Sequence, residues 1–157
     1  MKNGVVGAII LASAVAVGAQ TVDPDMKPQP GEYESRMEVI SVSIPGMPAN
    51  MADMMRGAMN RTTKFCLTAE DVEEGFKAAM RRSQDGECQF ERFNAVGGKI
   101  DAVMICQTET GPMTMNMDGI GSPTQSDVTM NVSGDMGMDE GPMNMKMRVI
   151  QNRLGSC

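Results

Sequence analysis

The side chains best suited to chemistry in this sequence carry sulfur. The chain of 157 residues contains 19 methionines, no histidine, and four cysteines at positions 66, 88, 106 and 157. Without histidine there is no His-based acid or base, no Ser-His-Asp or Cys-His nucleophile system and no mixed zinc site of the usual kind. The sequence therefore directs attention to disulfides and to thioether sulfur.

The even number of cysteines predicts two disulfides, for which three pairings are possible. We favour Cys66–Cys88 with Cys106–Cys157, the arrangement without interleaved loops. Free buried thiols would require a reducing compartment. A metal site built from all four cysteines lacks support, because the sequence contains no C-x-x-C pair.

Methionine is unusually frequent after residue 19, where the only leucines are Leu67 and Leu154. The simplest interpretation is that methionine fills the core in place of leucine. The alternative is Cu(I) binding, because thioethers favour this soft ion. The candidate ligands lie in runs with Met-x-Met spacing: Met113, Met115, Met117, Met136, Met138, Met143, Met145 and Met147. The strand at 113–117 would need a neighbour, such as 143–147, for its sulfurs to converge.

Two further interpretations of the methionines stay open. Exposed methionines can absorb oxidants reversibly as sulfoxides. The methionine-striped segment at 51–59 could line or cover a groove for a hydrophobic ligand or a partner, because methionine surfaces adapt to different shapes.

The carboxylates have explanations that need no catalysis. Those at 70–74 suit a helix start with a solvated face, and those at 135–140 lack EF-hand spacing. There is also no phosphate loop, no G-x-S-x-G and no dinucleotide fingerprint. We therefore expect no enzymatic activity, no catalytic residues and no cofactor.

The amino terminus has the pattern of a secretory signal. Lys2 precedes an apolar run from Val5 to Val17, and a small-residue site follows, with cleavage expected after Ala19. The run is shorter than the roughly 20 residues that span a bilayer. Residues 20–30 contain three prolines and are predicted to be extended. We expect a periplasmic or secreted protein.

The charge balance narrows the possible partners. Fourteen basic and 20 acidic residues give a net charge of −6 and a pI near 4.6. An acidic chain is a poor candidate for binding nucleic acid or an anionic membrane surface. No segment after the signal has the length and apolarity of a membrane span. The expected partner is an unknown ligand or a protein of the cell envelope.

Hydrophobic periodicity predicts the elements that must position the sulfurs. A β-branched strand over 32–44 ends at a Pro-Gly turn, and 48–59 has apolar residues at helical spacing. A short strand at 62–66 follows. Thr68 and Asp71 then form a variant capping box for a helix whose buried stripe consists of Val72, Phe76, Ala79 and Met80.

From residue 87 onward the pattern predicts an antiparallel meander. Gly97-Gly98 is a hairpin turn, and Phe93 marks a bulge because it breaks the alternation. Three more alternating strands are expected at 113–118, 127–133 and 143–150. Residues 31–157 thus predict one α+β domain, a curved half-barrel-like antiparallel sheet of six or seven strands with two short helices and two disulfides.

Several blocks of sequence together resemble a bacterial exported family, domain of unknown function 3617. They are Pro30-Gly31-Glu32-Tyr33-Glu34, Cys66-Leu67-Thr68-Ala69-Glu70-Asp71, Gly86-Glu87-Cys88, Cys106 and the terminal Asn152-Arg153-Leu154-Gly155-Ser156-Cys157. Tyr33 and Ala69 stand where members often carry tryptophan and proline. The resemblance covers nearly all of the chain after the signal. It implies an exported, methionine-rich protein and supplies no activity.

These observations favour a non-catalytic binding module of the cell envelope with an unknown ligand. Two alternatives stay open: a thioether Cu(I)-binding protein, and a structural or interaction protein without a small-molecule ligand.

Overall fold

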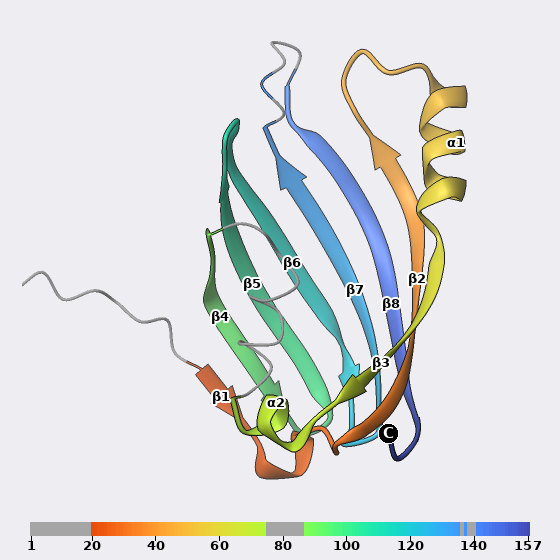
Figure 1. Cartoon of the computed structure of the whole chain (residues 1–157). Helices are drawn as coiled ribbons and strands as arrows, with labels where there is room; N and C mark the ends of the chain where they lie inside the picture. Colours follow the sequence, from red (N-terminus) through yellow and green to blue (C-terminus); the bar gives the residue numbers. More distant parts are fainter. Residues whose placement is uncertain (1–19, 75–86, 136, 138–140) are drawn as a thin grey trace, which may run out of the picture.

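The computed structural model describes residues 20–74, 87–135, 137 and 141–157 (Figure 1). The predicted signal, residues 1–19, lies outside the described residues. The elements in chain order are β1 (Gln20–Val22), a 3-10 turn (Pro24–Met26), β2 (Gly31–Ser43), α1 (Ala49–Met59), β3 (Arg61–Leu67), α2 (Ala69–Glu74), β4 (Glu87–Val96), β5 (Lys99–Thr108), β6 (Gly111–Gly121), β7 (Gln125–Gly134) and β8 (Met143–Gly155).

The strands form one open sheet in the order β1-β4-β5-β6-β7-β8-β2-β3. Figure 1 shows that the strands curve along their length and that α1 lies beside β2. The sheet has eight strands among the described residues, more than the six or seven expected. The additional strand is β1, which pairs in parallel with β4. Residues 20–22 were expected only to be extended. The edge of β4 presents unpaired N–H and C=O groups, and these serve as backbone partners for β1. No local sequence pattern reveals this pairing.

The turns and the bulge follow from local sequence. Gly97 and Gly98 have φ of +58° and +78°, the left-handed values that a two-residue hairpin turn needs. The register between β4 and β5 shifts between Phe90 and Arg92, so the extra residue is Glu91. The sequence predicts the bulge at Phe93, two residues further on. The sequence shows where the alternation of apolar and polar residues changes phase, but it does not show which residue is unpaired.

The apolar residues align across the sheet and form its core. Met117, Met130 and Met147 lie opposite one another on β6, β7 and β8, and Val39 continues the row on β2. Ala102 of β5 extends it in the other direction and is 1% exposed. The buried members of this core are Val39, Phe93, Ala95, Ala102, Met104, Cys106, Met115, Met117, Val132 and Met147.

The disulfides are Cys66–Cys157 and Cys88–Cys106, so the preferred pairing was wrong. Cys88 and Cys106 lie directly opposite each other in the β4–β5 hairpin. Cys66 lies beside Glu32 of β2, and Glu32 in turn lies beside Gly155 near the chain end. Sheet order decides the pairing, because β3 and β8 flank the same strand.

The second helix begins as its capping box predicts. The Thr68 backbone N–H donates to Asp71 Oδ2 at 3.0 Å, and the Asp71 N–H donates to Thr68 Oγ1 at 3.1 Å. Val72 is 8% exposed, in agreement with its predicted burial. The other members of the predicted stripe, Phe76, Ala79 and Met80, lie outside the described residues.

Candidate functional site

The candidate copper ligands lie mainly in the core. Met115, Met117 and Met147 are 9%, 3% and 7% exposed, and three more pack against the core while half-buried: Met113, Met143 and Met145. Met136 and Met138 lie outside the described residues.

The strands that carry these methionines are not neighbours, so 143–147 is not the adjacent strand that the sulfurs of 113–117 would need in order to converge. Strand β7 lies between β6 and β8 and separates them by two strand spacings, about 10 Å. Met113 and Met143 lie on either side of Gly134. A Cβ added at Gly134 would come within 3.2 Å of the Met113 side chain, so Met113 packs against the glycine. These thioethers act as packing groups that adapt to irregular space.

On β2, β6, β7 and β8 the opposite face of the sheet carries polar side chains and a shallow depression of about 390 Å³. We call it the polar depression. It spans β2, β6, β7 and β8 and is lined by Ser41, Ser43, Asn116, Asn131, Val132, Ser133, Asn144, Met145 and Lys146. Its polar side chains are short hydroxyls and amides, with one ammonium group.

Strand register arranges these polar side chains in two rows. The first row is Asn116, Asn131, Lys146 and Ser41, which lie opposite one another on adjacent strands. The second row is Thr114, Ser133, Asn144 and Ser43. Each row crosses three strand spacings, about 14 Å, and the rows lie about 7 Å apart along the strands.

Most of these side chains are free to bind something else. Asn144 donates to the Pro142 carbonyl at 3.3 Å. Within residues 20–74, 87–135, 137 and 141–157, Asn116, Asn131 and Ser133 make no side-chain hydrogen bond and Lys146 has no ion pair.

A bulge and an ion pair border the polar depression. The register of β2 against β8 shifts between Val39 and Ser41, which bends β2 beside the lining residues. At the same end, next to the bulge, Arg148 Nε donates to Asp127 Oδ1 at 2.7 Å. Hydrogen bonding from Arg148 holds the pKa of Asp127 below its usual value. This bordering pair is balanced in charge, so Lys146 supplies the local positive charge.

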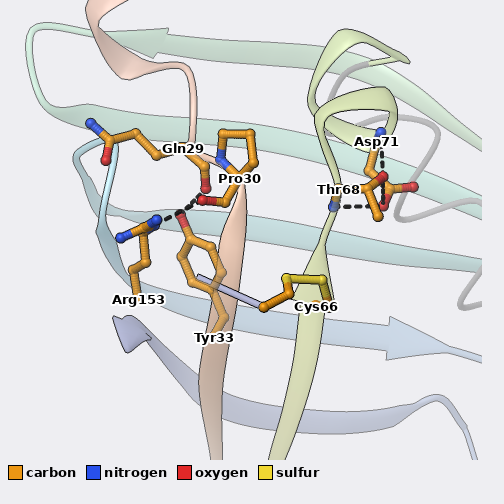
Figure 2. Close-up of a disulfide and its surroundings, with 8 residues drawn as sticks. Gln29, Pro30, Tyr33, Cys66, Thr68, Asp71 and Arg153 are labelled. Carbon is orange, nitrogen blue, oxygen red and sulfur yellow. Dashed lines mark hydrogen bonds between the residues drawn. A yellow bond between two sulfur atoms is a disulfide. The ribbon is translucent and has the colours of Figure 1, made fainter. Parts of the chain in front are cut away.

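The far end of the sheet is held together around Tyr33 (Figure 2). Tyr33 is 4% exposed, and its hydroxyl can donate to the carbonyl oxygens of Gln29 at 2.8 Å and Pro123 at 3.0 Å. Arg153 Nε donates to the Pro30 carbonyl at 2.9 Å. Burial is the main cause that raises the pKa of Tyr33. Together these contacts, which we call the Tyr33 junction, join the start of β2 to the β6–β7 loop and to β8.

Three of the blocks that carry the family resemblance meet at this end. The first supplies Tyr33, the second supplies Cys66, and the last supplies Arg153 together with Cys157, which is bonded to Cys66. Figure 2 shows Cys66, Tyr33 and Arg153 near one another. The three blocks therefore build a structural junction, and the polar depression has its lining residues elsewhere on the sheet.

Sequence reasoning missed the polar depression. The alternation that places methionine on one face of β6 and β8 also places Asn116, Asn144 and Lys146 on the other face. The sequence therefore contained a signal for a polar face on these two strands. Their lateral alignment with Asn131 and Ser41 depends on the strand order, which the pattern does not contain.

The described residues contain no group of three or more His, Cys, Asp or Glu side chains placed to hold a metal ion. No helix among them has the length and apolarity to cross a membrane.

The fold places the described part of the chain in the class of mostly β proteins, with one open eight-stranded sheet and two short helices. Its two disulfides are typical of proteins outside the reducing cytoplasm. The chain belongs to the family described as proteins of unknown function DUF3617, whose model matches residues 28–157. This confirms the resemblance that the sequence blocks indicated. Neither a curated protein nor a solved structure gives a significant match.

Proposed function

We propose that this protein is a non-catalytic binding protein of the cell envelope, periplasmic or secreted, and that the polar depression binds a hydroxyl-rich ligand of the oligosaccharide class. The secretory pattern of residues 1–19 and the two disulfides support the location. The observation that carries the binding role is the two aligned rows of polar side chains, in which Asn116, Asn131 and Ser133 make no side-chain hydrogen bond within the described part of the chain.

The chemistry of the rows suits sugars. An asparagine amide offers two donors and an acceptor, and a serine hydroxyl offers one donor and two acceptor sites. A sugar hydroxyl likewise donates and accepts, so adjacent hydroxyls can be matched by adjacent side chains on neighbouring strands. The positions of Asn116, Asn131 and Ser41 are held by backbone pairing, which reduces the entropy lost on binding.

The size and charge of the polar depression narrow the ligand further. A length of about 14 Å accommodates a short oligosaccharide better than a single small ion. Lys146 lies within the first row and favours a ligand that is neutral or carries a single carboxylate. The bordering Asp127–Arg148 pair adds little net charge, and we therefore expect no preference for polyanions.

The test is an NMR titration of the folded, oxidised protein with an N-acetylglucosamine disaccharide. We expect amide shifts that saturate and that cluster at Asn116, Asn131, Ser133 and Lys146. Asn131→Ala should weaken binding by about tenfold, the equivalent of one good hydrogen bond.

The matched control is Thr129→Ala, on the same strand and the same face but outside the polar depression. It should bind like the unaltered protein. Shifts spread over the whole surface, or equal weakening by both variants, would contradict the proposal. Stronger binding when the sugar carries a carboxylate, abolished by Lys146→Met, would assign the charge preference to Lys146.

A further inference from the structure

Helix α1 presents three thioethers to solvent. Met51, Met54 and Met55 are 51%, 70% and 37% exposed, and none of the residues of α1 is buried. We call these three residues the methionine triad. The segment was expected to bury its apolar stripe as core filler or to line a groove, and its exposure separates it from the packed methionines of β6 and β8.

The two side chains of α1 that are partly buried against the described part of the chain lie on one flank of the apolar stripe. Met59 packs against the core, and Ala52 is half-buried. With about 100° of turn per residue, these two side chains lie close together on the helix surface. Met54 and Met55 lie on either side of Met51, within an arc of about 100°. Met55 lies beside the sheet-facing flank, about 50° from it, and Met54 lies about 150° from it.

The spacing of the methionine triad brings its side chains together. Met54 and Met55 are the i+3 and i+4 neighbours of Met51, and such neighbours have Cβ atoms about 5–6 Å from that of residue i on a helix. Methionine has three rotatable bonds, so three sulfurs at this spacing can approach a common point above the helix. The neighbour on the same arc is Ala58, whose methyl group leaves that space open.

Charged groups on α1 lie away from the methionine triad. Arg56 Nη2 is 3.2 Å from Asp53 Oδ1, and helical geometry places this ion pair on the opposite side of the helix. A cation bound by the methionine triad therefore meets little repulsion from Arg56, and the net charge of −6 on the chain favours cation approach.

We propose that the methionine triad is a Cu(I) site in which Met51, Met54 and Met55 supply three thioether ligands. Soft thioether sulfur selects Cu(I) among the first-row ions. The site is on a different surface from the polar depression and does not depend on the proposed sugar binding. The metal binds as Cu(I) and leaves as Cu(I), so no electron transfer is part of the proposal.

The experiment is an anaerobic titration of the oxidised protein with Cu(I) in competition with a chromophoric chelator. We expect one equivalent of Cu(I) per chain to be withdrawn from the chelator. The triple variant M51L/M54L/M55L should lose at least tenfold in affinity, because leucine keeps the volume and helix propensity while removing the sulfur.

The matched control removes the same number of thioethers from the sheet, in M113L/M130L/M143L, and should keep the Cu(I) affinity of the unaltered protein. A second readout needs no variant: Ag(I), a redox-inert analogue, should shift the ε-methyl NMR signals of the methionine triad before those of Met117 or Met147. The proposal is overturned if the unaltered protein fails to compete, if M51L/M54L/M55L competes equally, or if the first shifts arise in the sheet.

Discussion

The hydroxyl of Tyr33 lies 3.0 Å from the carbonyl oxygen of Pro123, a residue 90 positions away in sequence. This contact joins the first long strand to the β6–β7 loop, and the stacking of Tyr33 on Phe65, with ring centroids 5.7 Å apart, extends it to β3. One side chain thus holds three separate parts of the chain at one end of the sheet.

Tyr33 should titrate above its ordinary value. The chain has one tyrosine and no tryptophan, so phenolate absorbance reports this group alone. Burial raises the pKa of the folded state, and unfolding restores a value near 10. The protonated Tyr33 hydroxyl therefore makes its full contribution to the free energy of unfolding below about pH 10, and this contribution is lost as pH rises through the folded-state pKa. Absorbance titrations of folded and urea-unfolded protein measure the difference, and identical curves would contradict it.

Tyr33→Phe should cost about 1 kcal/mol of unfolding free energy, the net value of the lost hydrogen bond. Urea unfolding at neutral pH measures this change. In this variant, stability should also no longer fall at alkaline pH because of Tyr33, since phenylalanine keeps the ring and removes the titrating hydroxyl. This difference distinguishes the contribution of the hydroxyl from that of the ring. A variant as stable as the unaltered protein would show that the contact to Pro123 adds nothing.

Gly31→Ala should destabilise the protein by more than about 2 kcal/mol. Gly31 has φ of +151°, and a Cβ there would collide with the Gly155 carbonyl oxygen and the Arg153 side chain. Gly57→Ala is the matched control, because a Cβ at this helical position meets nothing within 4 Å. It should be neutral or stabilising by up to about 1 kcal/mol. Thermal unfolding of both variants is the measurement, and similar losses in the two would refute the steric argument.

The two disulfides should contribute unequally. Cys66–Cys157 spans 91 residues and Cys88–Cys106 spans 18. Loop-closure entropy predicts losses of about 4–5 and about 3 kcal/mol when each pair is replaced by alanine. Peptide mapping without reduction should recover these two linkages. Recovery of a peptide that links Cys66 to Cys88 would contradict the pairing in the structure.

Hydrogen peroxide should oxidise the methionines in order of exposure. Each event adds one oxygen to a thioether, giving the sulfoxide and water. Met54 is 70% exposed and Met117 is 3% exposed, so Met54 should react first in the folded protein. Peptide mass spectrometry follows the two sites. In denaturant they should react at equal rates, and equal rates in the folded protein would mean that the core opens freely.

Much of the fold could be predicted because its signals are local. The paired glycines at 97–98 enforce a turn, the Thr68–Asp71 box begins a helix, and alternation of methionine with polar residues defines both faces of β6 and β8. Each of these depends on neighbours within a few residues, so a window of sequence contains the whole cause.

The sequence by itself determined the sulfur-rich chemistry, the even set of cysteines, the turns and the strands other than β1. Only the tertiary structure decided which strands are neighbours. That order pairs Cys66 with Cys157, inserts β7 between the methionines of β6 and β8, and aligns Asn131 with Lys146 in the polar depression. The tertiary structure also leaves Met54 exposed to solvent. Periodicity in the sequence defines an apolar stripe on a helix, but the packing of the whole chain decides whether another element covers that stripe.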